Sequence, residues 1–218
     1  GLGRAVDTLI RQGAIGDSPV SRAEKLCAAA SYARMSGVSM PVMTATGSGN
    51  QGITLLLTIE GVAQAMGIDE ETKLRAAALA NLINIYVKTF TGTLSAVCAC
   101  GVASGLGASV GVVYMLGGGE EQMLFAMQNI LGSICGMICD GAKEGCASKV
   151  QLSSGLAVKA AFLAMNGMGI RGGDGIVGTH GLSSLFENLG HLVREGMENT
   201  NSVIVEIMSG NEDCRDRA

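Results

Sequence analysis

Residues 98–119 read CACGVASGLGASVGVVYMLGGG, and this stretch decides the fold. It belongs to a segment that carries no charged residue between Lys88 and Glu120. A helix that is apolar on every side is buried, and glycine lets neighbouring backbones come close together. We therefore expect a buried, glycine-rich central helix over residues 95–116.

Helical signals continue on both sides of this stretch. Ser21 is placed to cap one helix, with Glu24 at the capping-box position, and Asp69 is placed to cap another. The helix after Asp69 carries apolar residues on one side at spacings of three and four. These residues are Leu74, Ala77, Ala78, Leu82 and Ile85.

The expected elements are almost all helices. Residues 203–208 are either a short strand or a last helical turn. Because strands do not alternate with helices, we predict an all-α helical bundle that forms one domain over residues 1–218. The predicted helices cover residues 2–14, 21–37, 53–67, 70–91, 95–116, 120–138, 147–166 and 182–198.

Composition excludes several classes of protein. Apolar residues make up 48% of the chain and charged residues 16%, which argues against disorder. A net charge of −4 gives no electrostatic reason to expect a nucleic-acid partner. The 33 glycines are about double the average share of ~7%, which indicates closely packed helices or loops near a ligand.

The cysteine count bears on the compartment. Seven cysteines is an odd number, and no charged-then-apolar leader follows Gly1, so we do not expect a secreted disulfide framework. A reducing, cytoplasmic setting is the expectation. The chain begins without methionine, as in a processed chain or part of a longer protein.

A membrane protein is an alternative class. A spanning helix needs only ~20 apolar residues, and glycines suit close helix packing in a bilayer. The uncharged segment, however, lacks an aromatic belt and contains many small residues, including Ser95, Ser104 and Ser109. We favour a buried helix in a protein interior and expect no membrane partner.

A second glycine-rich motif, TGSGNQG, covers residues 46–52. Its GxGxxG pattern matches the dinucleotide fingerprint, but residues 70–90 look helical where that fold needs a strand. Glycines before a helix also let backbone N–H groups bind an anion such as an amino-acid carboxylate, helped by Ser48, Asn50 and Gln51. An ordinary tight turn capping a helix is the equal alternative.

Five of the seven cysteines lie within residues 98–146. Cys139 and Cys146 would stand ~10.5 Å apart along a helix, but Gly141 and Gly145 allow the chain to fold back. Three thiolates around an iron–sulfur cluster would leave one iron open to a substrate. From spacing alone, buried free thiols are the simpler interpretation, because no common zinc pattern matches.

The remaining cysteines and the two histidines are weaker candidates. Cys27, Cys135 and Cys214 are expected to be ordinary thiols. His180 follows a glycine-rich loop and is a candidate for facing a site, whereas His191 is expected to be structural.

The segment CDGAKEGCASK at residues 139–149 resembles iron–sulfur L-serine dehydratase alpha chains. It is most similar to the branch that includes L-cysteine desulfidases. Residues 46–52, the CAC of residues 98–100 and the IVEIM of residues 204–208 agree with this family in order. The resemblance covers nearly the whole chain and corresponds to the C-terminal half of longer family members.

The resemblance implies a [4Fe–4S] cluster held by three cysteines, whose open iron engages the substrate. Carried over, the ligands are Cys139, Cys146 and Cys100, with Cys98 as the alternative to Cys100. The glycine loop falls at the family's substrate-binding loop. The implied contacts with a small amino-acid substrate come from Thr46, Gly47, Ser48, Gly49, Asn50 and Gln51.

The implied reaction is an α,β-elimination. L-Cysteine would give pyruvate, ammonia and sulfide, and L-serine would give pyruvate and ammonia. No catalytic base is identified; the missing N-terminal half or a separate chain is expected to be a partner, and a homo-oligomer is expected. A non-catalytic iron–sulfur or redox-sensing module and a small helical membrane protein are the alternatives.

Overall fold

The computed structural model describes residues 1–215, including the side chains of residues 1–210. Within residues 1–215 it contains nine α-helices, one π-helical turn at Leu192–Gly196 and no β-sheet, which confirms the all-α prediction. No helix in this part of the chain has the length and apolar character needed to cross a bilayer. The helices are α1 (Leu2–Arg11), α2 (Pro19–Met35), α3 (Gly49–Met66), α4 (Glu70–Thr91), α5 (Val102–Met115), α6 (Glu120–Ile134), α7 (Cys146–Met165), α8 (Gly181–His191) and α9 (Thr200–Arg215).

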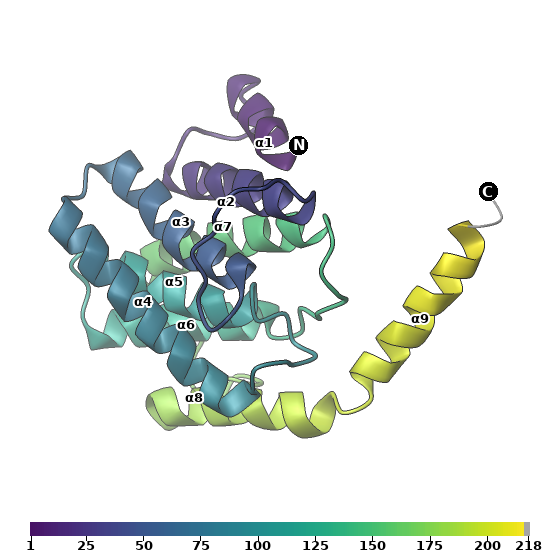
Figure 1. Ribbon diagram of the computed structural model, residues 1–218. Helices are drawn as coiled ribbons and strands as arrows, with labels where there is room; N and C mark the ends of the chain where they lie inside the picture. The colour runs from purple at the N-terminus through teal and green to yellow at the C-terminus, as the bar shows by residue number, and fades with distance from the viewer. Residues whose placement is uncertain (216–218) are drawn as a thin grey trace.

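Helix α5 is the centre of the bundle. It contacts α3, α4, α6 and α7, and of its 14 residues only Tyr114 is not buried. The predicted buried, glycine-rich central helix is therefore confirmed (Figure 1). It begins at Val102, later than the expected residue 95, because residues 96–98 pair with a distant segment instead of continuing the helix.

Helix α4 buries a different side from the one that its large apolar residues mark. Leu82 is 62% exposed, whereas Ala76 and Ala80 are fully buried. The reason lies in α5: a side chain at Gly107 would meet the Ala80 carbonyl, and Gly111 faces the carbonyl of Ala76. Small residues on both helices let the two backbones come close, so α5 selects the alanine side of α4.

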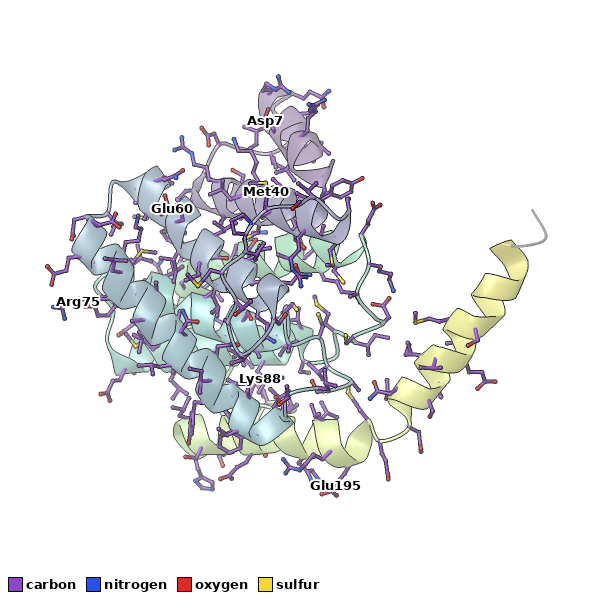
Figure 2. The ribbon with its side chains drawn as sticks, viewed as in Figure 1. Asp7, Met40, Glu60, Arg75, Lys88 and Glu195 are labelled. Carbon is purple, nitrogen blue, oxygen red and sulfur yellow. The ribbon has the colours of Figure 1, made fainter. Side chains whose placement is uncertain are left out.

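Helix α4 lies on the outside of the bundle in Figure 1. Figure 2 shows Arg75 and Lys88 toward its two ends, with Arg75 directed away from the bundle. Arg75 pairs there with Glu71, one turn earlier on the same exposed side. Asp69 caps the helix as predicted, because its carboxylate accepts a hydrogen bond from the Thr72 backbone N–H.

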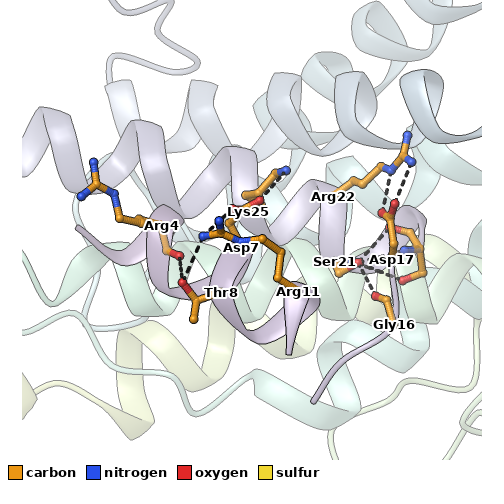
Figure 3. Close-up of polar contacts among 10 residues, drawn as sticks. Arg4, Asp7, Thr8, Arg11, Gly16, Asp17, Ser21, Arg22 and Lys25 are labelled. Carbon is orange, nitrogen blue, oxygen red and sulfur yellow. Dashed lines mark hydrogen bonds and ion pairs between the residues drawn. The ribbon is translucent and has the colours of Figure 1, made fainter. Parts of the chain in front are cut away.

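The connection between α1 and α2 is held by polar contacts (Figure 3). Asp17 accepts two hydrogen bonds from Arg22, at 2.8 and 3.0 Å, and Asp7 pairs with Lys25 at 3.2 Å. The cap of α2 is Ser18 and not Ser21, because Pro19 starts the helix two residues earlier than expected.

The structure decides between the alternatives predicted for residues 203–208 and corrects the helix predicted before them. Residues 203–208 are helical and belong to α9, which projects away from the bundle in Figure 1. The expected helix over residues 182–198 divides into α8 and the π-helical turn. Cys214 lies outside the residues whose side chains are described.

Truncating a buried leucine of α5 should cost more stability than truncating an exposed leucine of α4. Leu106 on α5 is fully buried, so Leu106→Ala should lower the free energy of unfolding by about 2–5 kcal/mol, from lost burial and the cavity left behind. The matched Leu82→Ala change on exposed α4 should lower it by less than about 0.5 kcal/mol. Urea denaturation of both variants measures the difference, and equal losses would show that this packing is wrong.

Candidate functional site

Two segments far apart in the sequence form a short antiparallel pairing beside the bundle. The Cys98 N–H donates to the Met137 carbonyl at 2.7 Å, and the Cys139 N–H donates to the Ala96 carbonyl at 2.7 Å. Val97 and Ile138 stand opposite each other between these bonds. The pairing places the CAC segment next to Cys139.

The glycine loop, residues 46–52, leads into the first turn of α3 and lies beside the CAC segment. Ser48 caps α3, and its Oγ lies 3.7 Å from the Cys100 Sγ, within hydrogen-bond range for sulfur. The loop folds closely over the helix because Gly52 has no side chain; a Cβ there would collide with the Met43 carbonyl. The motif leads into a helix as predicted, but α3 begins at Gly49, inside the motif, and not at the expected residue 53, because the Ser48 side chain caps it.

A cavity of about 410 Å³ opens where these segments meet. It is lined by Cys100, Cys139 and Cys146, the three predicted cluster ligands, together with Cys98. The glycine loop forms another part of its lining. The loop residues that line it are Thr46, Gly47, Ser48, Asn50 and Gln51.

The donor set of this cavity consists of thiols, the ligands that iron–sulfur clusters use. The described residues contain no group of three or more histidine, cysteine, aspartate or glutamate side chains close enough to hold one ion. An iron–sulfur cluster binds each thiolate at a different iron, so its ligands surround a larger object. Four thiols without a competing carboxylate or imidazole in the lining suit that requirement.

The thiols of Cys98 and Cys100 differ in the direction in which their pKa values are shifted. The hydrogen bond from Cys98 lowers the pKa of Cys100 to about 7, against the opposing effect of burial. The same hydrogen bond, together with burial, raises the pKa of Cys98. Iron binds the thiolate form, and Cys100 is the more readily ionised of the two predicted candidates.

The loop that carries Cys139 is anchored by a lysine from α7. Lys149 donates to the Ile138 carbonyl at 2.9 Å and pairs with the Asp140 carboxylate, which Lys143 also contacts at 2.6 Å. Burial acts to raise the pKa of Asp140, but the hydrogen bonds from the two lysines outweigh it and lower the pKa to about 2. Asp140 therefore stays ionised and keeps the loop tied to α7.

Cys146 completes the set from the other end of this loop. It is the first residue of α7, and its thiol donates to the Gly141 carbonyl at 3.4 Å. Gly141 has a φ of +88°, a conformation that favours glycine, so the chain folds back there as expected. The loop thus turns Cys139 and Cys146 toward one cavity.

Sequence reasoning missed two polar residues of this region. Arg34, from α2, is the single charged side chain among the described residues that line the cavity. Asn84, from α4, is fully buried behind the glycine loop and hydrogen-bonds to Thr46 and Gln51. Neither residue belongs to a motif; a polar Asn84 on the alanine side of α4 was the only available signal.

Several candidates lie elsewhere. Gly49 is buried against Arg34 and does not line the cavity, and Cys135 ends α6 outside it. His180 precedes α8 at the surface, and His191 pairs with Glu195. Cys27 is a fully buried core thiol, as expected.

The chain matches a protein family described as serine dehydratase alpha chain over residues 3–206. It is 43% identical over 208 residues to a UPF0597 protein of Desulfatibacillum aliphaticivorans, covering 95% of this chain and 47% of that protein. It is 41% identical to UPF0597 protein DP0591 of Desulfotalea psychrophila, covering 95% of this chain and 48% of that protein. The chain thus spans about half the length of these relatives, and no solved structure matches it.

Removing the lysine anchor should loosen the loop that carries Cys139. In Lys149→Met the Ile138 carbonyl and Asp140 lose a charged partner, a loss of about 1 kcal/mol for a partly exposed pair. Backbone amides at residues 137–141 should then exchange hydrogen about fivefold faster. Lys159→Met, on the exposed side of the same helix, is the control and should leave them unchanged. Unaltered protection in both variants would show that Lys149 does not hold the loop.

Proposed function

Because this chain belongs to the family of serine dehydratase alpha chains, we propose that it is the cluster-binding part of an iron–sulfur lyase acting on L-cysteine or L-serine. The observation that carries the proposal is the convergence of Cys100, Cys139 and Cys146 on one cavity. These residues come from three separate segments: the turn before α5, the loop after α6 and the start of α7. A glycine loop suited to an anionic substrate borders the same cavity.

In the proposed reaction, L-cysteine and water give pyruvate, ammonium and hydrogen sulfide, because the thiolate that leaves takes up the proton removed from Cα. L-Serine gives pyruvate and ammonium, because the water that is eliminated balances the water that hydrolyses the enamine. A [4Fe–4S] cluster bound by three thiolates would supply a Lewis-acidic iron for the leaving sulfur or oxygen. Cys100, Cys139 and Cys146 would hold this cluster.

The polar residues that share the lining with the thiols are suited to an amino-acid carboxylate. Arg34 brings a guanidinium to the lining, and α3 presents the positive end of its dipole behind Ser48. Thr46, Gly47, Asn50 and Gln51 provide backbone and side-chain donors beside it. In this arrangement the carboxylate is held at the loop while the β-substituent points toward the thiols.

The base that removes the Cα proton is proposed to come from outside this chain's cavity lining. Among the described residues, no aspartate, glutamate, histidine or lysine side chain lines the cavity. The relatives are about twice as long as the part they share with this chain. We therefore assign the base to that additional half or to a separate chain.

The lack of a base among the described residues of the lining favours one alternative function, a cluster-binding or redox-sensing module without lyase activity. A cavity with thiols but without a base is sufficient to hold a cluster and insufficient to remove a proton. Pyruvate formation from L-cysteine and L-serine, assayed with a protein of the relatives' full length, separates the two functions. Cluster binding without pyruvate from either substrate would support the sensor.

Cluster binding itself is tested by counting iron and sulfide after anaerobic reconstitution. We expect about four of each per chain in the wild type, and strongly reduced counts in Cys100→Ser, Cys139→Ser and Cys146→Ser, because a serine hydroxyl is a poor replacement for thiolate. Cys135→Ser is the matched control, since this thiol lies just outside the cavity and should not alter the counts.

Iron counts in two variants identify the third ligand. Cys98→Ser should retain more iron than Cys100→Ser if Cys100 is the ligand. Wild-type iron content in both Cys139→Ser and Cys146→Ser would refute the ligand assignment.

A further inference from the structure

We propose that Asn84 is a positioning residue that turns the amide nitrogen of Gln51 toward the cavity, where it donates a hydrogen bond to a ligand carboxylate. The identity of the ligand, an α-amino acid, rests on the proposed function. The orientation of Gln51 rests on hydrogen bonds alone. The two parts are therefore tested separately.

Asn84 uses both ends of its side-chain amide inside the bundle. The residue is 0% exposed, and its Nδ2 donates to Gln51 Oε1 at 3.2 Å and to Thr46 Oγ1 at 3.3 Å. Its Oδ1 accepts a hydrogen bond from the Ser104 hydroxyl of α5 at 3.4 Å. The amide of Asn84 is thus tied to α5 on one side and to the glycine loop on the other.

Gln51 receives two donors on its carbonyl oxygen. The Thr46 hydroxyl donates to Gln51 Oε1 at 2.7 Å, and Asn84 donates to the same atom. A carbonyl oxygen has two lone pairs, so this end of Gln51 is saturated. The opposite end, the Nε2 group, must then point away from Asn84 and Thr46.

That opposite end has no hydrogen-bond partner among the described residues, although Gln51 is only 4% exposed. Within the same residues, the single side-chain polar atom that is sealed from solvent without a partner is Gln128 Oε1. Gln51 Nε2 therefore keeps contact with solvent, and the cavity is the opening that Gln51 lines. Two N–H donors are presented there beside Arg34 and the start of α3.

Backbone strain at Thr46 also supports a network that orients the Gln51 amide. Thr46 has a φ of +47° and is the only non-glycine residue with a positive φ among those described. Such a conformation persists when its surroundings hold it, and it is found preferentially at functional sites. Here the Thr46 hydroxyl is held by Gln51 and Asn84, so the strain belongs to the network that orients the amide.

The network predicts what happens when Asn84 loses its donor. In Asn84→Asp the new carboxylate can still accept from Ser104, but it faces Gln51 Oε1 with an oxygen instead of an N–H group. Gln51 should rotate its amide by half a turn so that Nε2 donates to that carboxylate. The cavity would then meet a carbonyl oxygen, which repels a ligand carboxylate.

Side-chain amide NMR tests the orientation without any cluster or activity. In the wild-type chain, the Gln51 NH₂ protons should exchange rapidly with water and the Asn84 NH₂ protons slowly. In Asn84→Asp, the Gln51 NH₂ protons should become protected. Asn81→Asp is the matched control: Asn81 lies one turn earlier on the same helix, and its Nδ2 bonds to the Ala77 carbonyl instead of to the loop.

Two outcomes overturn the positioning role. One is slow exchange of the Gln51 NH₂ protons in the wild type, and the other is their unchanged exchange in a folded Asn84→Asp variant. If that variant does not fold, the wild-type measurement alone decides, because fast exchange at Gln51 beside slow exchange at Asn84 is required by the proposal.

The ligand is tested by steady-state kinetics in a reconstituted protein of the relatives' full length. Asn84→Asp should raise KM for L-serine or L-cysteine by about tenfold or more, with a smaller change in kcat, and Asn81→Asp should change neither. A rotated Gln51 with an unchanged KM would refute the carboxylate role. Absence of activity toward both substrates in the wild type would instead refute the proposed function, and the NMR result would still decide the role of Asn84.

Discussion

The pairing of residues 96–98 with residues 137–139 is the constraint on which the candidate site depends. Two backbone hydrogen bonds of 2.7 Å join these segments, one of which precedes α5 while the other follows α6. Because the contacts are between backbone atoms, they hold the positions of Cys98, Cys100 and Cys139 whatever their side chains do. Lys149 then fastens the same loop to α7, next to Cys146.

The close packing of α4 on α5 supports the part of the cavity that the glycine loop forms. Gly107 and Gly111 admit the alanine side of α4, and this choice carries Asn84 inward to meet Ser104 and the glycine loop. The helix contact therefore determines both the core and the polar support of the loop, so stability and site geometry share one cause.

Much of this arrangement follows from the sequence, and the rest depends on contacts that no local pattern encodes. The all-α class, the buried helix around Gly107, the cap at Asp69 and a helix following the glycine motif were predicted because they rest on hydropathy, glycine and capping, although that helix begins at Gly49 and not at residue 53. The exposed Leu82 was not, since the buried side of α4 is chosen by its neighbour. Arg34 was missed because α2 reaches the cavity only through tertiary packing.

The central claim is that Cys100, Cys139 and Cys146 surround one inorganic cluster. It is tested most directly by an anaerobic crystal structure with anomalous diffraction measured at the iron edge. The account predicts a compact anomalous peak inside the cavity, bonded to the Sγ atoms of these three cysteines, with one corner facing the glycine loop. Iron bound at any other place, or a cavity in which the three thiols hold no iron after reconstitution, would contradict it.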